Sequence, residues 1–220
     1  IIDNLSTQRY ASCMDLPPEP SYKLLVGDVA ECVSAKRIGK VDCVVHLAGL
    51  TNAVRSMSHP DQLWKNNYRI TRHVVDYCVS QSVPLIFPSS TSVYTPSSSA
   101  VDEESIELEP ISEYARCKLA EERYIMNRMG RGPATVLRFG TVFGPSPGMS
   151  FHTAVNKFCW QTAIGEPLEV WETALHQVRP YLSVDDAAAA IAFAAFGLQD
   201  SGRWILNIAS CSATVSEVLA

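Results

Sequence analysis

Apolar residues along the chain form two kinds of pattern. Continuously apolar runs at residues 41–49, 84–89 and 134–139 end in small or polar residues, which is typical of buried strands. Residues 61–81 instead carry Leu63, Ile70, Val74 and Tyr77 at helical spacing, which predicts an amphipathic helix. Strands that are apolar throughout and alternate with helices predict a parallel sheet covered by helices on both faces.

The remaining expected elements continue this alternation. Further strands are expected at residues 1–5, 22–26 and 204–208, and further helices at 29–38, around Tyr114, at 153–163 and at 183–196. The chain opens without Met on what reads as the end of a strand, so we expect a fragment. The pattern predicts an α/β fold with a doubly wound parallel sheet that lacks its first β-α unit and carries a small C-terminal lobe.

Composition restricts the classes of function. With 47% hydrophobic and 19% charged residues in 220, the chain can bury a substantial core, and a net charge of −5 makes nucleic acid an unexpected partner. No apolar run is long enough to span a membrane, so no membrane partner is expected. The seven cysteines are scattered without a C-x-x-C pair, which predicts reduced core thiols in a cytoplasmic protein. No histidine has a second ligand at helical spacing, so no metal is expected.

Residues 112–118, SEYARCK, carry the most specific candidate chemistry. Tyr114 and Lys118 are four positions apart, so on a helix they share one face. A neighbouring ammonium favours the phenolate, and lowering the pKa of a tyrosine from about 10 to about 7 takes about 4 kcal/mol. The same spacing also fits an ordinary half-buried tyrosine beside a solvated lysine.

Unusual residues follow five of the expected strands. They are Asp3, Asp28, the pair Ala48 and Gly49, residues 89–92, and the pair Gly140 and Thr141. Each alone fits a polar turn. Because ligands of open α/β sheets bind beyond the carboxyl ends of the strands, the set predicts a binding site at one sheet edge.

Taken together, these segments resemble the extended short-chain dehydrogenase/reductase family, in its NAD-dependent sugar-nucleotide epimerase/dehydratase branch of the UDP-glucose 4-epimerase type. The matching segments are IDNL at 2–5, GDV at 27–29, HLAG at 46–49, NYRIT at 67–71, SSTSVY at 89–94, YARCK at 114–118, LRF at 137–139, GP at 144–145 and RPYLSVDD at 179–186. The glycine-rich turn of this family would precede Ile1. The resemblance implies a partial NAD-binding Rossmann-like domain at 1–145, rejoined by 179–209, and a substrate-binding lobe at 146–178 and 210–220.

The resemblance also implies the binding residues. The cofactor NAD would contact Asp3, Asn4, Asp28, Val29, Leu47, Ala48, Gly49, Asn67, Tyr114, Lys118 and Phe139. The Asp3 carboxylate would accept hydrogen bonds from the adenosine ribose, which favours NAD over NADP. The nucleotide-sugar substrate would contact Ser90, Ser92, Thr141 and Arg179, with the guanidinium on the diphosphate. Arg179 could instead pair with Asp185 or Asp186.

The implied reaction is interconversion of nucleotide-sugar epimers through a transient keto sugar, with Ser90, Tyr114 and Lys118 as catalytic residues. Thr91 and Ser92 stand where sugar-nucleotide 4,6-dehydratases carry an Asp-Glu pair, which argues against dehydration. Two alternatives stay open: an NAD-dependent dehydrogenase or reductase of the same fold, and a catalytically silent nucleotide-binding fragment. Thr141 leaves the sugar undetermined, and a homodimer is possible.

Overall fold

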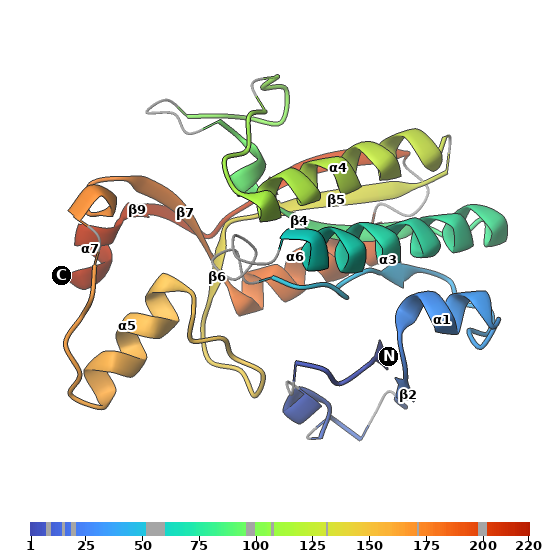
Figure 1. Ribbon diagram of the computed structural model, residues 1–220, viewed down its shortest axis with the longest axis horizontal. Helices are drawn as coiled ribbons and strands as arrows, with labels where there is room; N and C mark the ends of the chain where they lie inside the picture. Colours follow the sequence, from blue (N-terminus) through green and yellow to red (C-terminus); the bar gives the residue numbers. More distant parts are fainter. Residues whose placement is uncertain are drawn as a thin grey trace.

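The computed structural model describes residues 1–7, 10–14, 16–18, 21–51, 60–95, 100–106, 108–130, 132–170, 172–197 and 202–220 (Figure 1). In chain order the elements are β1 (Ile2–Asp3), η1 (Tyr10–Cys13), β2 (Leu25–Val26), α1 (Val29–Ser34), β3 (Val44–Val45), α3 (Pro60–Gln81), β4 (Leu85–Ser90), η2 (Thr91–Val93), α4 (Glu113–Arg128), β5 (Ala134–Phe139), β6 (Thr141–Phe143), α5 (Ala154–Ala163), η3 (Glu172–Ala174), β7 (Val178–Ser183), α6 (Val184–Gly197), β8 (Arg203–Ile208), β9 (Cys211–Thr214) and α7 (Val215–Leu219).

A four-stranded parallel sheet in the order β3-β4-β5-β8 forms the centre of the protein. Alternate side chains of its strands point to opposite faces, as strand geometry requires. Leu85 and Phe87 of β4 belong to a core cluster with residues of α3 and α4, whereas Ile86 between them packs with Ala194 of α6. Helices therefore cover both faces, and the predicted doubly wound α/β architecture is confirmed.

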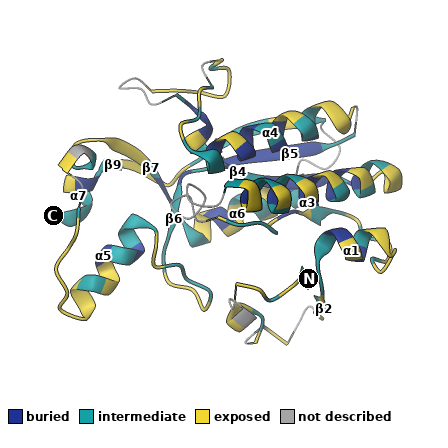
Figure 2. Cartoon of the chain, in the orientation of Figure 1, coloured by how far each residue is buried: buried dark blue, intermediate teal, exposed yellow. Residues whose placement is uncertain are grey.

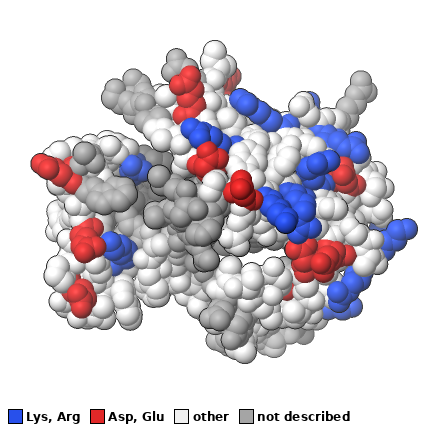
Figure 3. Space-filling model, viewed as in Figure 1, with Lys and Arg blue, Asp and Glu red and all other residues white. Residues whose placement is uncertain are grey.

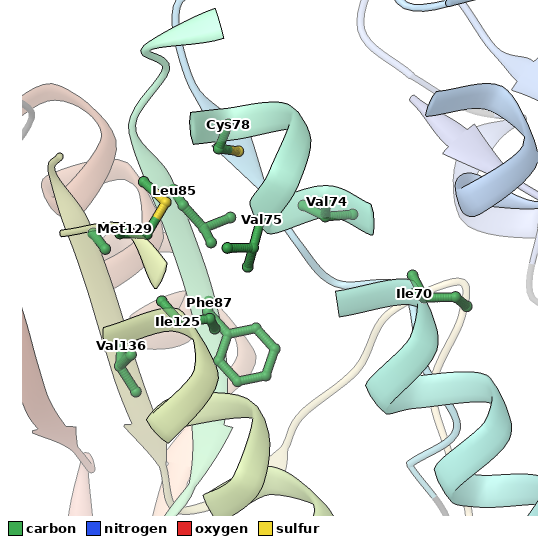
Figure 4. Close-up of a cluster of buried hydrophobic side chains, with 10 residues drawn as sticks. Ile70, Val74, Val75, Cys78, Leu85, Phe87, Ile125, Met129 and Val136 are labelled. Atoms are coloured by element: carbon green, nitrogen blue, oxygen red, sulfur yellow. The ribbon is translucent and has the colours of Figure 1, made fainter. Parts of the chain in front are cut away.

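The larger core cluster lies between the sheet and the helices α3 and α4. Figure 4 shows its labelled members: Ile70, Val74, Val75 and Cys78 from α3, Ile125 and the adjoining Met129 from α4, and Leu85, Phe87 and Val136 from the sheet. Val75, Cys78, Ile125 and Val136 have no exposed surface. Figure 2 shows the buried residues concentrated along β4, β5 and the helix faces turned toward them. Each fully buried aliphatic side chain contributes about 1.5–3 kcal/mol relative to an exposed one, so this layer fixes the position of α4 on the sheet.

Two smaller sheets flank the centre. Strands β1 and β2 form a parallel pair. Among the described residues, no strand joins this pair to β3 at the edge of the central sheet. Strand β7 pairs parallel with β6 and antiparallel with β9. This three-stranded sheet lies with α5 and α7 at the left of Figure 1, beside the ends of β4 and β5.

Several bounds predicted from the sequence are wrong. The strand expected at 41–49 is only Val44–Val45, the two residues in register with β4, and the His46 N–H donates one more bond to Ile86 O at 2.9 Å. The helix expected to reach residue 38 ends at Ser34. Lys36 has a φ of 51°, its N–H donates to Val33 O, and the Arg37 N–H donates to Cys32 O. These bonds form a Schellman-type helix end. Strands β6, β7 and β9 were not predicted.

The cysteine prediction is correct only in part. All seven cysteines are unpaired, and Cys32, Cys78 and Cys117 are buried. Cys159 and Cys211 are exposed, so the expectation of core thiols is wrong for these two. No helix in the described part of the chain is long and apolar enough to cross a membrane. Acidic and basic side chains are interspersed over the face shown in Figure 3.

Candidate active site

Helix α4 brings Tyr114 and Lys118 to the carboxyl end of β4. The Ser112 hydroxyl caps the helix by accepting the Ala115 N–H at 3.1 Å, which fixes where its first turn begins. One turn later, the Lys118 ammonium donates to Pro88 O of β4 at 3.3 Å and lies 4.2 Å from the centroid of the Phe87 ring. The lysine is therefore a buried side chain anchored two residues from Ser90, and not the solvated lysine that the spacing alone also fits.

Ser89 and Ser90 point to different environments. The buried Ser89 hydroxyl donates to the Glu122 carboxylate on the core side of the sheet. The half-buried Ser90 hydroxyl accepts from the Ser92 N–H at 3.2 Å and lies 2.9 Å from the Ser92 hydroxyl. Strand alternation thus turns Ser90 away from the face on which Glu122 lies, and the turn that follows holds Ser92 beside it.

The charges around Tyr114 act in opposite directions. Burial raises the pKa of Tyr114, the Lys118 ammonium lowers it, and the Glu121 carboxylate raises it; together they leave that pKa above its ordinary value. Burial lowers the pKa of Lys118, but Glu121 and then Tyr114 raise it, and the net shift is upward. Within this chain, the charge of Lys118 alone does not lower the pKa of Tyr114 toward neutral pH.

Asn67 holds the segment that follows β3. Its buried side chain donates to Leu50 O at 2.9 Å and accepts the Leu50 N–H at 2.8 Å. The α-carbon of Gly49 lies against the same amide, which a β-carbon there would approach to 3.4 Å. Leu47 is 63% exposed, Ala48 is half-buried, and both precede this clamp. The structure therefore places Leu47, Ala48 and Gly49 in one fixed turn beyond a strand end.

The residues expected at the adenosine end lie in two turns. Asp3 ends β1 and accepts the Leu5 N–H at 2.6 Å, and Asn4 accepts the Ser6 N–H at 3.0 Å. Both residues are exposed. These local bonds fix the direction of the turn, which presents the Asp3 carboxylate at the strand end.

Asp28 has a structural role that the sequence did not reveal. One carboxylate oxygen caps α1 by accepting the Ala30 N–H at 2.8 Å, and the other accepts from the Arg69 guanidinium at 3.0 Å. The pair joins α1 to α3. Val29 packs against the larger core cluster, so any contact between Val29 and an adenine would come from its backbone.

Two of the expected substrate residues, Thr141 and Arg179, lie on the three-stranded sheet. Thr141 starts β6, and Phe139 at the end of β5 packs toward the α6 side of the core. A β-carbon on Gly140 would come within 2.8 Å of Pro180 O, so only glycine allows β7 to approach the end of β5 this closely. Arg179 directly precedes Pro180 on β7 and is paired with Ala213 of β9.

Arg179 is exposed on β7 and donates to the Gln177 side chain at 2.7 Å. Among the described residues it forms no ion pair with Asp185 or Asp186. The Asp186 carboxylate instead accepts from the Ser210 hydroxyl, and the Asp186 N–H donates to the Ser183 hydroxyl at 3.0 Å. The alternative pairing considered from the sequence is therefore wrong.

Sequence reasoning missed a buried ionic network beside the site. The Arg138 guanidinium donates to both oxygens of Glu122, at 2.8 and 3.2 Å, and to the Tyr94 hydroxyl at 2.8 Å. Tyr94 in turn lies 2.8 Å from Asn207 Oδ1. The available signal was Arg138 itself, a charge inside the apolar strand TVLRF, because a fully buried arginine requires an acidic partner.

Comparison with known proteins identifies the family of this chain and the fold it shares with solved structures. Residues 2–209 match the model of the NAD dependent epimerase/dehydratase family. The ADP-L-glycero-D-manno-heptose-6-epimerase of Brachyspira hyodysenteriae is 24% identical over 158 residues, which are 68% of this chain and 48% of that protein. The chain thus spans about half the length of this curated relative.

Solved structures share the fold over nearly the whole chain. The UDP-N-acetylglucosamine 4-epimerase from Methanobrevibacter ruminantium, in complex with UDP-N-acetylmuramic acid, superposes with a TM-score of 0.86 at 25% identity, covering 99% of this chain and 71% of that one. MoeE5 in complex with UDP-glucose and NAD gives a TM-score of 0.80 at 24% identity, covering 99% and 78%. Since the family match extends over almost all of the sequence, this chain belongs to the NAD dependent epimerase/dehydratase family.

Proposed function

We propose that the protein is an NAD-dependent epimerase of a nucleotide sugar that acts through a transient keto sugar. The observation that carries the proposal is the junction of α4 with the end of β4, where Lys118 is anchored to Pro88 O beside Ser90 and one helical turn from Tyr114. A phenol, a buried cation and a hydroxyl near one strand end are the groups that oxidation of a sugar hydroxyl requires, which supports the proposal.

The proposed cofactor residues suit NAD by their chemistry. The exposed carboxylate of Asp3 offers acceptors for the two ribose hydroxyls and would repel the 2′-phosphate of NADP. The turn of Leu47, Ala48 and Gly49 offers an exposed apolar side chain followed by small residues over which a dinucleotide can lie. Asn4, Asp28, Val29, Asn67 and Phe139 border these contacts, and Asp28 and Asn67 act by fixing the backbone.

When bound, NAD would supply the acceptor for the hydride of the sugar carbon and its donor in the return step, so that the hydride could come back to the other face of the keto sugar. Tyr114 takes the hydroxyl proton and gives it back, and Ser90 hydrogen-bonds the same hydroxyl. Lys118 binds the nicotinamide ribose and stabilises the phenolate. Arg179 pairs with the substrate diphosphate as a planar, permanently charged fork, while Ser92 and Thr141 border the sugar. Proton transfer of this kind contributes roughly 10²–10⁴-fold to the rate.

An assay of nucleotide sugars with NAD tests the function directly. We expect the sugar to be converted to its epimer with no net change in NADH absorbance, because the hydride is returned in each turnover. Net NADH formation would instead identify a dehydrogenase, and absence of both signals would identify a nucleotide-binding protein without catalysis. Either result would contradict the proposal.

Cofactor choice tests the Asp3 assignment. Asp3→Ser is expected to narrow the affinity gap between NAD and NADP by about tenfold or more, because the carboxylate that repels the 2′-phosphate is removed. Asn4→Ser is a matched control, since Asn4 makes the same kind of turn bond one residue later. Equal affinities of the unmutated protein for the two cofactors, measured by fluorescence titration, would show that Asp3 does not hold the ribose.

Three further features belong to the proposal. We retain a substrate lobe at 146–178 and 210–220, which contains α5, β9 and α7, with 1–145 and 179–209 as the NAD-binding domain. Strand β6 and most of β7, which pair with β9 in one sheet through β7, lie within the second set of ranges. The unpaired cysteines support a cytoplasmic location. We retain a homodimer as part of the proposal.

A further inference from the structure

A second buried carboxylate lies behind the proposed catalytic lysine. Glu121 is 1% exposed and stands three residues after Lys118 on α4. Its Oε2 atom is 3.5 Å from the Lys118 ammonium. The neighbouring Glu122 points to Arg138, so the two adjacent glutamates have separate partners.

A directed chain of hydrogen bonds fixes Glu121 from the side away from Lys118. The Thr71 hydroxyl donates its single proton to Glu121 Oε1 at 2.5 Å. Thr71 must therefore accept at its 3.0 Å contact with His46 Nε2, so His46 carries its proton on that nitrogen. Burial, followed by the charge of Lys118, lowers the pKa of His46 to about 3, which keeps the ring neutral. The chain runs from His46 through Thr71 to Glu121 and leaves the carboxylate as an acceptor only.

The contact between Glu121 and Lys118 is electrostatic more than directional. Among the described residues, Glu121 Oε2 has no hydrogen-bond donor although it is buried, and its 3.5 Å separation from the ammonium is long for a hydrogen bond. The other contact of the ammonium, with Pro88 O, is 3.3 Å. Lys118 is therefore held in place by charge, and its donors are not committed to short bonds within the protein.

Few titratable groups face this ion pair. On α4 they are Tyr114 and Cys117, and on the sheet side the nearest is the neutral His46. Burial raises the pKa of Cys117 to about 12, with Glu121 adding to the shift, so the thiol is uncharged. The only formal charges acting on Tyr114 in this set are those of Lys118 and Glu121, and they are opposite in sign.

We propose that Glu121 is a positioning residue of this site: its carboxylate holds the Lys118 ammonium at the end of β4 and offsets the charge of that lysine at Tyr114. This inference rests on the proposed function only in taking Tyr114 as the group that transfers the proton. Because loss of a nearby anion lowers the pKa of every neighbouring acid, neutralising Glu121 lowers the pH at which Tyr114 ionises.

The test is the titration of Tyr114 in the full chain, followed by the ultraviolet absorbance of its phenolate. The signal of Tyr114 is isolated by subtracting the titration of the same protein that also carries Tyr114→Phe. In Glu121→Gln the midpoint is expected to fall by about one pH unit or more. In Glu121→Asp, the shorter side chain keeps the negative charge but moves it away from Lys118, so the titration midpoint of Tyr114 is expected to fall by a smaller amount. The acid limb of the turnover profile is expected to move by the same amounts.

Glu113→Gln is the matched control. It removes a carboxylate next to Tyr114 in sequence, but one that is partly exposed and paired with Arg116 and Trp64, and it is not expected to move the midpoint. A midpoint unchanged in both Glu121 variants, or shifted equally in Glu113→Gln, overturns the inference. If Glu121→Gln does not fold, Glu121→Asp decides.

Turnover and absorbance separate the two proposals. A Glu121 variant that lowers turnover at every pH without moving the acid limb or the midpoint has a merely structural role, which overturns the inference. If no nucleotide sugar is turned over but the midpoint falls, the inference stands and the proposed function fails.

Discussion

Tyr114→Phe is expected to reduce turnover of the nucleotide sugar by at least about 100-fold while NAD binding stays nearly unchanged. The substitution removes only the phenol oxygen, and positioned proton transfer contributes roughly 10²–10⁴-fold to such reactions. The ring of this half-buried residue keeps its packing, and Lys118 keeps its anchors at Pro88 O and Glu121. The measurement is kcat for epimer formation, with cofactor affinity from fluorescence titration.

Tyr124→Phe is the control for this experiment. Tyr124 lies on the same helix, and its hydroxyl contacts Asp76 of α3 at 3.4 Å, away from the end of β4. Its loss is expected to leave kcat within about twofold, because it removes one weak contact to an exposed group. A Tyr114→Phe protein that keeps most of the unmutated kcat would remove Tyr114 from the catalytic role.

Arg138→Met is expected to lower the free energy of unfolding by about 3–5 kcal/mol, because it leaves the Glu122 charge buried without its partner. Both side chains of the pair are at most 3% exposed, and the Tyr94 hydroxyl also loses its donor. For a chain of this size the loss corresponds to a fall of roughly 10 °C in Tm. Denaturant unfolding followed by circular dichroism measures the free energy.

Arg128→Met provides the matched surface control. Arg128 pairs with Asp76 at 3.0 Å, but both side chains are about half exposed, so this pair is expected to contribute no more than about 1 kcal/mol. The double variant Glu122→Gln with Arg138→Met is expected to lose less stability than the sum of its single variants, since the second change removes a charge already left unpaired. Equal losses in Arg138→Met and Arg128→Met would show that burial of the pair has no energetic consequence.

The sequence by itself determined the layers of the protein and the order of its main elements. Continuous apolar runs at 84–89 and 134–139 became β4 and β5 almost residue for residue, because a strand covered on both faces needs apolar side chains at successive positions. Helix α3 matched its predicted bounds within one residue, since its apolar face recurs at helical spacing. The four-residue spacing of Tyr114 and Lys118 likewise placed both on α4.

Tertiary structure alone decided how those elements combine into a site. Pairing partners set the short length of β3 and created the β6-β7-β9 sheet, because strand ends depend on hydrogen bonds to residues far away in the chain. The same holds for the ion pairs of Asp28 with Arg69 and Glu122 with Arg138, whose members are 41 and 16 residues apart. Glu121 gives the clearest case: the sequence shows an acidic residue near Lys118, but only packing against Thr71 and His46 buries its charge and turns it toward the lysine.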